Sequence, residues 1–218
     1  MKLWTLPCTF AAALSLVLIP ACKKEEPKTE APTKVANTVA STKEVAVIKT
    51  SEGEMVIEFW PDVASNTVEN FKALAQKGFY DGTGFHRIID GFMIQGGDPN
   101  TKDPSKESEW GQGGPGYTIK GEVSNRPDRR HVRGVISMAN SGHPDTAGCQ
   151  FFICLEALPQ LDGGYTTFGK LIKGDDVLMR LAKSPVKPNP FDPRREMSRP
   201  INRVSLESIK IVLADSVK

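Results

Sequence analysis

Two segments of the chain carry side chains whose types and spacing suit a binding site for a peptide. In residues 85–98, Arg87 precedes Gln95 by eight positions, with large apolar side chains between them. The large apolar residues of this segment are Phe92 and Met93. A later segment, residues 137–154, adds Ala139, Asn140, Gln150 and Phe152. The set offers hydrogen-bond donors and apolar surface but no evident nucleophile, metal cluster or carboxylate pair. Such residues can bind and distort a peptide without making or breaking a covalent bond.

Strand periodicity predicts that these residues line one pocket. Side chains two positions apart in a strand point to the same face, so Met93 shares a face with Gln95, and Gln150 shares one with Phe152. If the two strands lie side by side, they form an apolar pocket with Phe92, rimmed by amides. On periodicity alone, the apolar residues suit a sheet core better. An arginine flanked by Ile and aromatic residues fits that alternative poorly, because a buried guanidinium needs partners.

The charge balance gives no support for a nucleic-acid partner. Lys and Arg number 28 against 26 Asp and Glu, a net charge of +2, whereas surfaces that bind nucleic acids are strongly basic. The basic run at residues 126–133 is interpreted as a solvated loop face, with a phosphate or anionic-lipid contact as the alternative. His86, His131 and His143 lack the close spacing of metal ligands, so we expect no metal and no cofactor.

Two further patterns have structural explanations. Residues 111–116 match a G-x-G-x-x-G pattern, but a nucleotide site needs a helix after it. Here Pro115 lies inside the pattern and a strand-like run follows, which predicts a flexible loop. Cys149 and Cys154 lie in a strand-like run, where five residues span roughly 16 Å. A disulfide needs alpha carbons within about 7 Å, so we expect two buried thiols.

The N-terminus has the pattern of a targeting segment. Lys2 precedes an apolar run at residues 10–19, shorter than the roughly 20 residues of a membrane-spanning helix. The following Ile19-Pro-Ala-Cys22 resembles a bacterial lipobox. We therefore expect residues 1–21 to be a lipoprotein signal peptide and Cys22 to be the lipidation site. The mature protein would be exported and membrane-anchored, facing the periplasm in a cell with an outer membrane. The alternative is simple cleavage after Ala21, with Cys22 unmodified.

The remainder divides into a tether, one domain and a tail. Residues 22–43 mix charges with Pro, Thr and Ala and have too little apolar surface to form a core, which predicts a disordered tether. Residues 44–214 form the predicted domain, and residues 215–218 a C-terminal tail.

Within the domain, the periodicity predicts a mostly β fold with two helices. Strands are predicted in a hairpin at 45–59 and at 85–89, 92–96, 117–122, 134–139, 150–155, 166–172 and 203–213. Helices are predicted at 66–78, with Asn66 as its cap, and at 175–183. Residues 184–202, rich in Pro and Arg, are predicted to be a loop. This order favours a closed, mostly antiparallel sheet with helices packed at its ends.

At this point the motifs resemble those of the cyclophilins, the peptidyl-prolyl cis-trans isomerases, over roughly residues 44–213. The resemblance rests on Phe85-His-Arg-Ile-Ile-Asp-Gly-Phe-Met-Ile-Gln-Gly-Gly-Asp98, Gly134-Val-Ile-Ser-Met-Ala-Asn140, Gln150-Phe-Phe-Ile153, Leu161-Asp-Gly163 and Phe168-Gly-Lys170. It implies a closed eight-stranded antiparallel β-barrel capped by two α-helices, with an active groove on the outside.

The resemblance also implies site residues. Arg87 matches the catalytic arginine, and the substrate-binding positions are His86, Phe92, Met93, Gln95, Ala139, Asn140, Gln150, Phe152, Leu161 and Tyr165. Two positions depart from the family pattern. Gln160 stands where the members most sensitive to cyclosporin carry Trp, and Tyr165 stands where His is frequent. These departures bear on cyclosporin affinity more than on catalysis.

Two hypotheses about function follow. The first is a monomeric, cofactor-free isomerase that accelerates rotation of Xaa-Pro bonds in exported polypeptides by non-covalent stabilisation of the transition state. The second is a membrane-tethered module or chaperone that binds proline peptides and turns them over incidentally. Every matched catalytic position is occupied, which favours the isomerase.

Overall fold

A computed structural model describes residues 43–217, so the expected signal peptide, Cys22 and nearly all of the expected tether lie outside the described residues. The strands are β1 (Glu44–Thr50), β2 (Gly53–Phe59), β3 (Thr83–Gly84), β4 (Arg87–Ile89), β5 (Met93–Gly96), β6 (Val135–Met138), β7 (Phe151–Cys154), β8 (Thr167–Lys173), β9 (Val186–Pro188), β10 (Met197–Pro200) and β11 (Ser205–Leu213). The α-helices are α1 (Ser65–Gln76) and α2 (Asp175–Ala182). Short 3₁₀ helices lie at Pro99–Lys102, Pro104–Glu109, Pro127–Arg129, Pro144–Thr146, Pro159–Leu161 and Ala214–Ser216.

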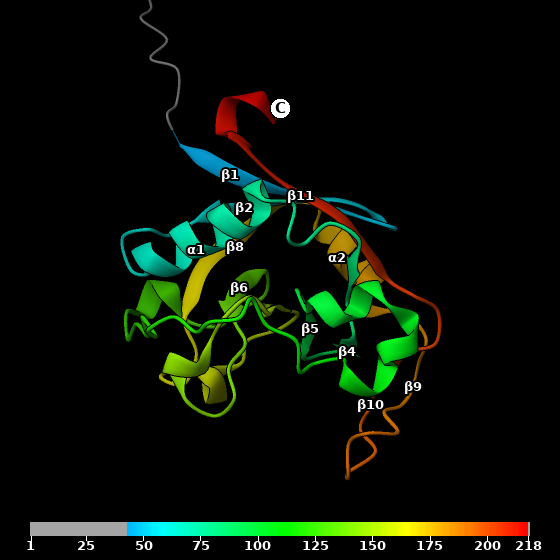
Figure 1. The fold of residues 1–218 in the computed structure, drawn as a ribbon. Coiled ribbons are helices and arrows are strands. Elements are labelled where there is room, and N and C mark those ends of the chain that lie inside the picture. The colour runs from blue at the N-terminus through cyan, green and yellow to red at the C-terminus, as the bar shows by residue number, and fades with distance from the viewer. Residues whose placement is uncertain (1–42, 218) are drawn as a thin grey trace, which may run out of the picture. The chain divides into compact units, whose positions relative to one another are not determined.

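Nine of the strands form one curled, antiparallel sheet in the order β3-β11-β1-β2-β8-β6-β7-β5-β4 (Figure 1). The prediction of a mostly β, cyclophilin-like fold is confirmed. The sheet has nine strands rather than eight, and within residues 43–217 no ladder pairs its two edge strands, β3 and β4. The closed eight-stranded barrel therefore stays a prediction.

The sheet and the two helices enclose the main core. The stripe predicted for the first helix is buried in α1 and consists of Val68, Phe71, Leu74 and Ala75. In α2, Val177, Leu178 and Leu181 are buried, and Asp175 and Asp176 lie in the first turn. These acidic residues complement the partial positive charge of a helix N-terminus. Both predicted helices are confirmed to within a few residues at each end.

The N-terminus of α1 is capped from a distance rather than by its own sequence. Asn66 was the predicted cap, but the helix begins at Ser65 and has no cap from its own side chains. Instead, the Glu122 carboxylate accepts hydrogen bonds from the backbone N–H groups of Asn66 (3.1 Å) and Thr67 (2.8 Å). These N–H groups have no partner inside a helix, so a carboxylate at this place stabilises it.

The capping role explains why the strand predicted at residues 117–122 is wrong. Only an isolated bridge between Ile119 and Ala147 forms there. The backbone N–H of Gly121 donates to the Asp145 carboxylate, and that of Glu122 donates to the Thr166 hydroxyl. Because side chains satisfy these groups, the segment needs no strand neighbour.

The loop predicted at residues 184–202 is also partly wrong. Strands β9 and β10 pair antiparallel as a separate two-stranded sheet. We call residues 186–200 the arm. In Figure 1 the arm extends beside β4, below α2. The sequence did not indicate this hairpin, because the prolines interrupt the alternation of apolar and polar residues that is typical of a strand.

The two described cysteines are buried and unpaired, which confirms the prediction of no disulfide between them. Burial raises the pKa of the Cys149 and Cys154 thiols to about 12, so both stay protonated and behave as small apolar side chains. No helix within residues 43–217 combines the length and apolar character that crossing a bilayer requires.

Candidate active site

Three neighbouring strands bring the predicted site residues into one row. Arg87 on β4 lies opposite Gln95 on β5, and Gln95 lies opposite Phe152 on β7. Residues directly opposite each other in an antiparallel pair share a face of the sheet. The β4–β5 hairpin therefore sets the spacing of Arg87 and Gln95, and β7 adds the aromatic ring.

This row opens onto a cavity of about 150 Å³. Its lining brings together nine of the eleven residues that the resemblance implied: Arg87, Phe92, Met93, Gln95, Ala139, Asn140, Phe152, Leu161 and Tyr165. We call this cavity the apolar pocket. The roles of these residues stay predictions, and the structure brings them from four separate segments to one cavity.

Aromatic and aliphatic packing holds the floor of the apolar pocket. Met93 and Phe152 belong to a small buried cluster that is separate from the main core. His131 stacks on Phe152 at 5.9 Å between ring centroids, and Tyr165 meets Phe152 edge to face at 5.5 Å. Burial lowers the pKa of His131. The Asp162 carboxylate, 2.8 Å from Nδ1 of His131, raises this pKa, but by less than burial lowers it. His131 is therefore a neutral, packed support for the pocket.

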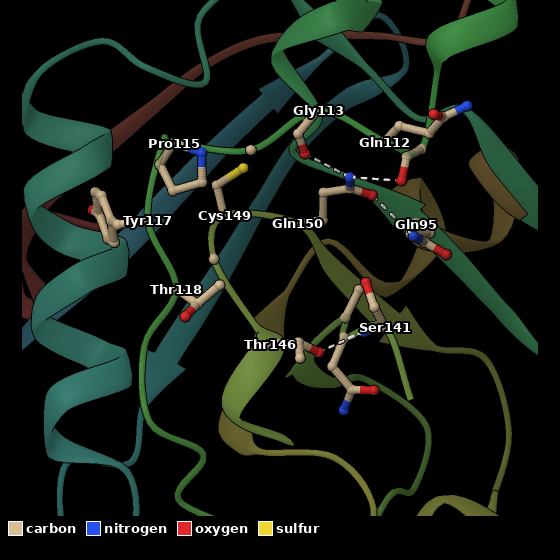
Figure 2. Close-up of a pocket in the computed structure, with 15 residues that line it drawn as sticks. Gln95, Gln112, Gly113, Pro115, Tyr117, Thr118, Ser141, Thr146, Cys149 and Gln150 are labelled. Atoms are coloured by element: carbon tan, nitrogen blue, oxygen red, sulfur yellow. Dashed lines mark hydrogen bonds between the residues drawn. The ribbon is translucent and has the colours of Figure 1, made fainter. Parts of the chain in front are cut away.

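Figure 2 shows a larger and more polar cavity of about 380 Å³. It adjoins the apolar pocket and shares Gln95, Ala139 and Asn140 with it. The loop at residues 111–116 forms one wall of it. Gln150 lines this second cavity rather than the apolar pocket. The two cavities together form a groove that can hold a peptide on both sides of a proline ring.

Gln150 joins the loop wall to the row of site residues. Its Nε2 donates to the backbone oxygens of Gly111 (3.0 Å) and Gly113 (2.8 Å), and its Oε1 accepts from Gln95 Nε2 at 3.1 Å. These contacts fix both amides. The loop predicted at residues 111–116 is thus a wall of the groove. Its Gly113 packs against Asp98, where a Cβ would clash with the carboxylate.

Asn140 has a similarly fixed amide. Its Nδ2 donates to Gly164 O at 2.9 Å, and its Oδ1 accepts from Gly142 N at 3.0 Å. The neighbouring Ala139 is partly exposed and presents only a methyl group between the two cavities. A ligand backbone can therefore pass over Ala139.

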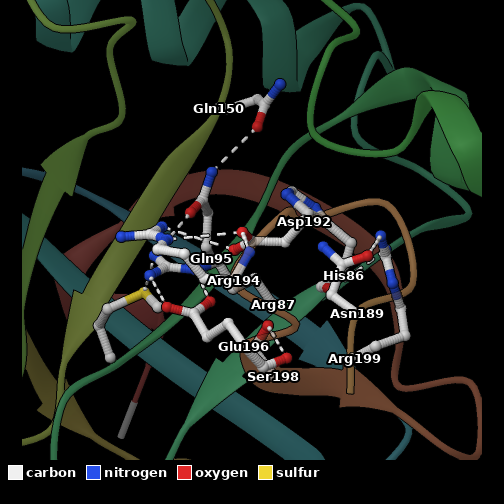
Figure 3. Close-up of polar contacts among 11 residues, drawn as sticks. His86, Arg87, Gln95, Gln150, Asn189, Asp192, Arg194, Glu196, Ser198 and Arg199 are labelled. Carbon is white, nitrogen blue, oxygen red and sulfur yellow. Dashed lines mark hydrogen bonds and ion pairs between the residues drawn. The ribbon is translucent and has the colours of Figure 1, made fainter. Parts of the chain in front are cut away.

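Arg87 borders the apolar pocket but is also ion-paired. Its Nε and Nη2 donate to the two carboxylate oxygens of Glu196, at 2.7 and 2.8 Å (Figure 3). Its Nη1 points the other way and donates to Gln95 Oε1 at 3.5 Å and to the Met93 sulfur at 3.8 Å. The guanidinium carbon lies 5.8 Å from the centre of the Phe92 ring. One edge of the guanidinium is therefore engaged by Glu196, and Nη1 makes long contacts with two residues that line the pocket.

Sequence reasoning missed Glu196. It lies 109 positions from Arg87, on an arm that was predicted to be a loop. The sequence offered one signal, that a guanidinium flanked by apolar residues needs a partner. This signal predicts a partner but does not identify which residue it is.

His86 lies outside both cavities of the groove, although the resemblance implied a groove-wall position. Adjacent residues of an extended segment point to opposite faces, so His86 faces away from its neighbour Arg87. It is 5% exposed and lines a separate cavity of about 180 Å³ together with Phe85 and Trp110. Burial, reinforced by the charges of Arg199 and Arg87, lowers its pKa to about 3.

We expect His86→Met to flatten the pH dependence of the free energy of unfolding. Between pH 6.5 and 3 the unfolded chain binds a proton at this histidine and the native chain does not. The free energy of unfolding therefore falls as the pH drops through 6.5, by about 2 kcal/mol between pH 7 and 5. Urea unfolding at pH 7 and pH 5 measures the difference.

His143→Met is the matched control, because His143 is exposed. This variant should keep the wild-type difference between the two pH values. If His86→Met kept it as well, His86 would not be held neutral in the native state.

Comparison with known proteins agrees with this geometry. Residues 45–211 match the model of the cyclophilin type peptidyl-prolyl cis-trans isomerase family. A peptidyl-prolyl cis-trans isomerase of Synechococcus elongatus is 45% identical over 139 residues, which cover 64% of this chain and 86% of the relative. Peptidyl-prolyl cis-trans isomerase B of Bacillus subtilis is 49% identical over 117 residues, covering 54% of this chain and 75% of the relative.

A solved structure is similar over the same region. The Cryptosporidium parvum cyclophilin type peptidyl-prolyl cis-trans isomerase, crystallised in the presence of the dipeptide Ala-Pro, superposes with a TM-score of 0.66 and 35% identity. The match covers 77% of this chain and 98% of that one. The family match spans the strands that carry the groove and the arginine that borders it, and the chain belongs to the cyclophilin-type peptidyl-prolyl cis-trans isomerases.

Proposed function

We propose that Arg87 and the apolar pocket catalyse rotation about Xaa-Pro bonds by stabilising the twisted amide, without a covalent step. The observation that carries this proposal is the direction of Arg87 Nη1, which faces a pocket of apolar side chains while the other edge of the guanidinium is engaged. Proline-containing polypeptides are the proposed substrates, in keeping with the family and with a relative crystallised in the presence of Ala-Pro.

The chemistry follows from amide conjugation. Rotation faces a barrier of about 18–20 kcal/mol because the planar amide loses conjugation as it twists. In the twisted state the proline nitrogen regains a lone pair. A donor that meets this state better than either planar form lowers the barrier. Arg87 is the donor beside the pocket, and the apolar walls exclude water and strengthen the contact.

The neighbouring amides hold the rest of the peptide. Gln95 and Asn140 lie where the two cavities meet, and their amide groups have fixed directions. With the proline ring held in the apolar pocket and the flanking backbone held in the groove, the carbonyl on the other side of the Xaa-Pro bond turns. No covalent intermediate and no cofactor enter this mechanism.

The test is the rate of cis–trans exchange of a short Ala-Pro peptide, measured by NMR without a coupling protease. The wild-type protein should accelerate exchange. Ala139→Leu should raise KM at least tenfold, because its side chain would fill the passage between the cavities.

Ala73→Leu is the matched control, since Ala73 is exposed on α1, and it should match the wild type. Peptide binding without accelerated exchange would favour the alternative of a binding module. Wild-type KM in Ala139→Leu would contradict the proposed path of the peptide.

We also propose that the protein acts on exported polypeptides from a membrane anchor. The support is the lipobox-like sequence that ends at Cys22 and the charged, Pro-containing residues 22–43 that follow it. In this proposal the domain is monomeric and, in a cell with an outer membrane, faces the periplasm. Mass spectrometry of the mature protein tests the anchor: Cys22 should carry a lipid, and an unmodified Cys22 would contradict it.

Closure of the sheet into an eight-stranded barrel is part of the same proposal. Strands β3 and β4 are separated by only two residues, Phe85 and His86. Each of these two residues donates a backbone hydrogen bond to a segment at one end of the sheet. Phe85 N donates to Val204 O, next to β11, and His86 N donates to Gln95 O on β5. If residues 83–89 are counted as one bent strand, the sheet has eight strands and no free edge.

A further inference from the structure

The arm places a carboxylate on the guanidinium that borders the apolar pocket. Glu196 contacts Arg87 through both of its oxygens, at 2.7 and 2.8 Å. The exposed fractions of the two side chains are 31% for Arg87 and 24% for Glu196. Both residues are therefore mostly shielded from water, and the geometry is the paired, fork-like contact that is strongest between these groups.

The arm is anchored beside β4 by buried contacts, so Glu196 is not a free surface side chain. Arg199, on the same arm, is 2% exposed. It donates to His86 O and to Asn189 Oδ1, both at 3.2 Å (Figure 3). Its guanidinium carbon also lies 5.2 Å from the centre of the Trp110 ring. A buried arginine with these partners fixes the base of the hairpin.

The tip of the arm is fixed as well. The backbone N–H of Asn189 donates to Glu196 O at 2.8 Å. The Asp192 carboxylate accepts from the backbone N–H of Arg194 at 2.8 Å, and Arg195 N donates to Asp192 O at 2.8 Å. The backbone oxygen of Glu196 is therefore held by Asn189, and its carboxylate is held by Arg87.

The contact determines which nitrogen of Arg87 reaches the pocket. With Nε and Nη2 engaged by Glu196, Nη1 is left beside Gln95 and Met93. A free arginine side chain occupies many rotamers and would have to be ordered during each turnover. The carboxylate also offsets part of the positive charge, but a hydrogen bond depends on direction as well as charge.

We propose that Glu196 is a positioning residue, which holds Arg87 so that Nη1 faces the Xaa-Pro bond in the apolar pocket. The inference rests on the proposed role of Arg87 in catalysis. The arm is thus part of the active site even though it contributes no residue to the lining of the apolar pocket.

The test compares Glu196→Ala and Glu196→Gln in the full chain on an Ala-Pro peptide. Glu196→Ala should lower kcat about tenfold (~1.4 kcal/mol of transition-state stabilisation) and change KM less than twofold. Glu196→Gln should recover part of the loss, because one amide oxygen still accepts from the guanidinium. Glu207→Ala is the matched control: it removes a glutamate that is paired with Lys49 outside the groove, and should behave as the wild type.

A double-mutant cycle separates positioning from a general effect on the fold. In an Arg87→Ala background, Glu196→Ala should change kcat/KM less than twofold, because its effect passes through Arg87. An equal loss in both backgrounds would show a structural effect and overturn the inference. So would unchanged or increased kcat in Glu196→Ala. Full activity of Arg87→Ala alone would instead refute the proposed role of Arg87 itself.

A spectroscopic readout covers the case in which Glu196→Ala folds poorly. The Nε–H resonance of Arg87, assigned by its absence in Arg87→Ala, should exchange slowly with solvent in the wild type. It should exchange faster in Glu196→Gln, which is close to isosteric. An equally slow exchange in Glu196→Gln together with a lowered kcat would overturn the inference, because activity would then be lost while the guanidinium stayed held.

Discussion

Replacement of Arg87 by alanine is expected to lower kcat/KM for an Ala-Pro peptide at least tenfold and up to about a hundredfold. A hydrogen bond to a charged group contributes about 1.5–3 kcal/mol, and each tenfold in rate corresponds to about 1.4 kcal/mol. The loss should fall mainly on kcat, because the Nη1 contact is made best with the twisted amide. The NMR exchange assay described above measures it, together with a melting curve.

The fold should survive the change. Glu196 loses its partner, but a quarter of its side chain is exposed, so water can solvate the carboxylate. Arg87→Lys should retain part of the activity, because an ammonium keeps the charge but not the planar fork. Arg133→Ala is the control: Arg133 is exposed and pairs with Asp175 away from the groove. Full activity in Arg87→Ala would rule out the mechanism.

Replacement of Phe71 by alanine is expected to lower the free energy of unfolding by about 3–5 kcal/mol. Phe71 is 0% exposed, and its ring centroid lies within 6 Å of those of four other aromatic rings: Phe59 (5.9 Å), Tyr80 (5.1 Å), Phe151 (5.6 Å) and Phe168 (5.2 Å). These rings join α1 to the sheet. The melting temperature should fall on the order of 10 °C.

Phe191→Ala is the matched control for this prediction. Phe191 is 52% exposed near the tip of the arm, and its removal should change stability by no more than about 0.5 kcal/mol. Equal stabilities of the two variants, measured by urea unfolding, would mean that α1 does not depend on this aromatic cluster.

Local patterns in the sequence determined most of the strands, both helices and most of the residues of the groove. Arg87 and Gln95 lie on one hairpin with a short turn, so their register follows from nearby residues alone. The same applies to the buried stripe of α1, whose spacing follows the helical period. The family resemblance added Leu161 and Tyr165, which no periodicity connects to the other pocket residues.

Only the tertiary structure decided which distant residues provide the hydrogen-bond and ion-pair partners of these elements. Glu122 caps α1 from 55 positions away, residues 117–122 form no strand, and His86 faces away from the groove. Above all, Glu196 reaches Arg87 across 109 positions. A strand or helix leaves a period in the sequence because its contacts are local and repeated. A single long-range ion pair leaves no period, and its partners become known only when packing brings them together.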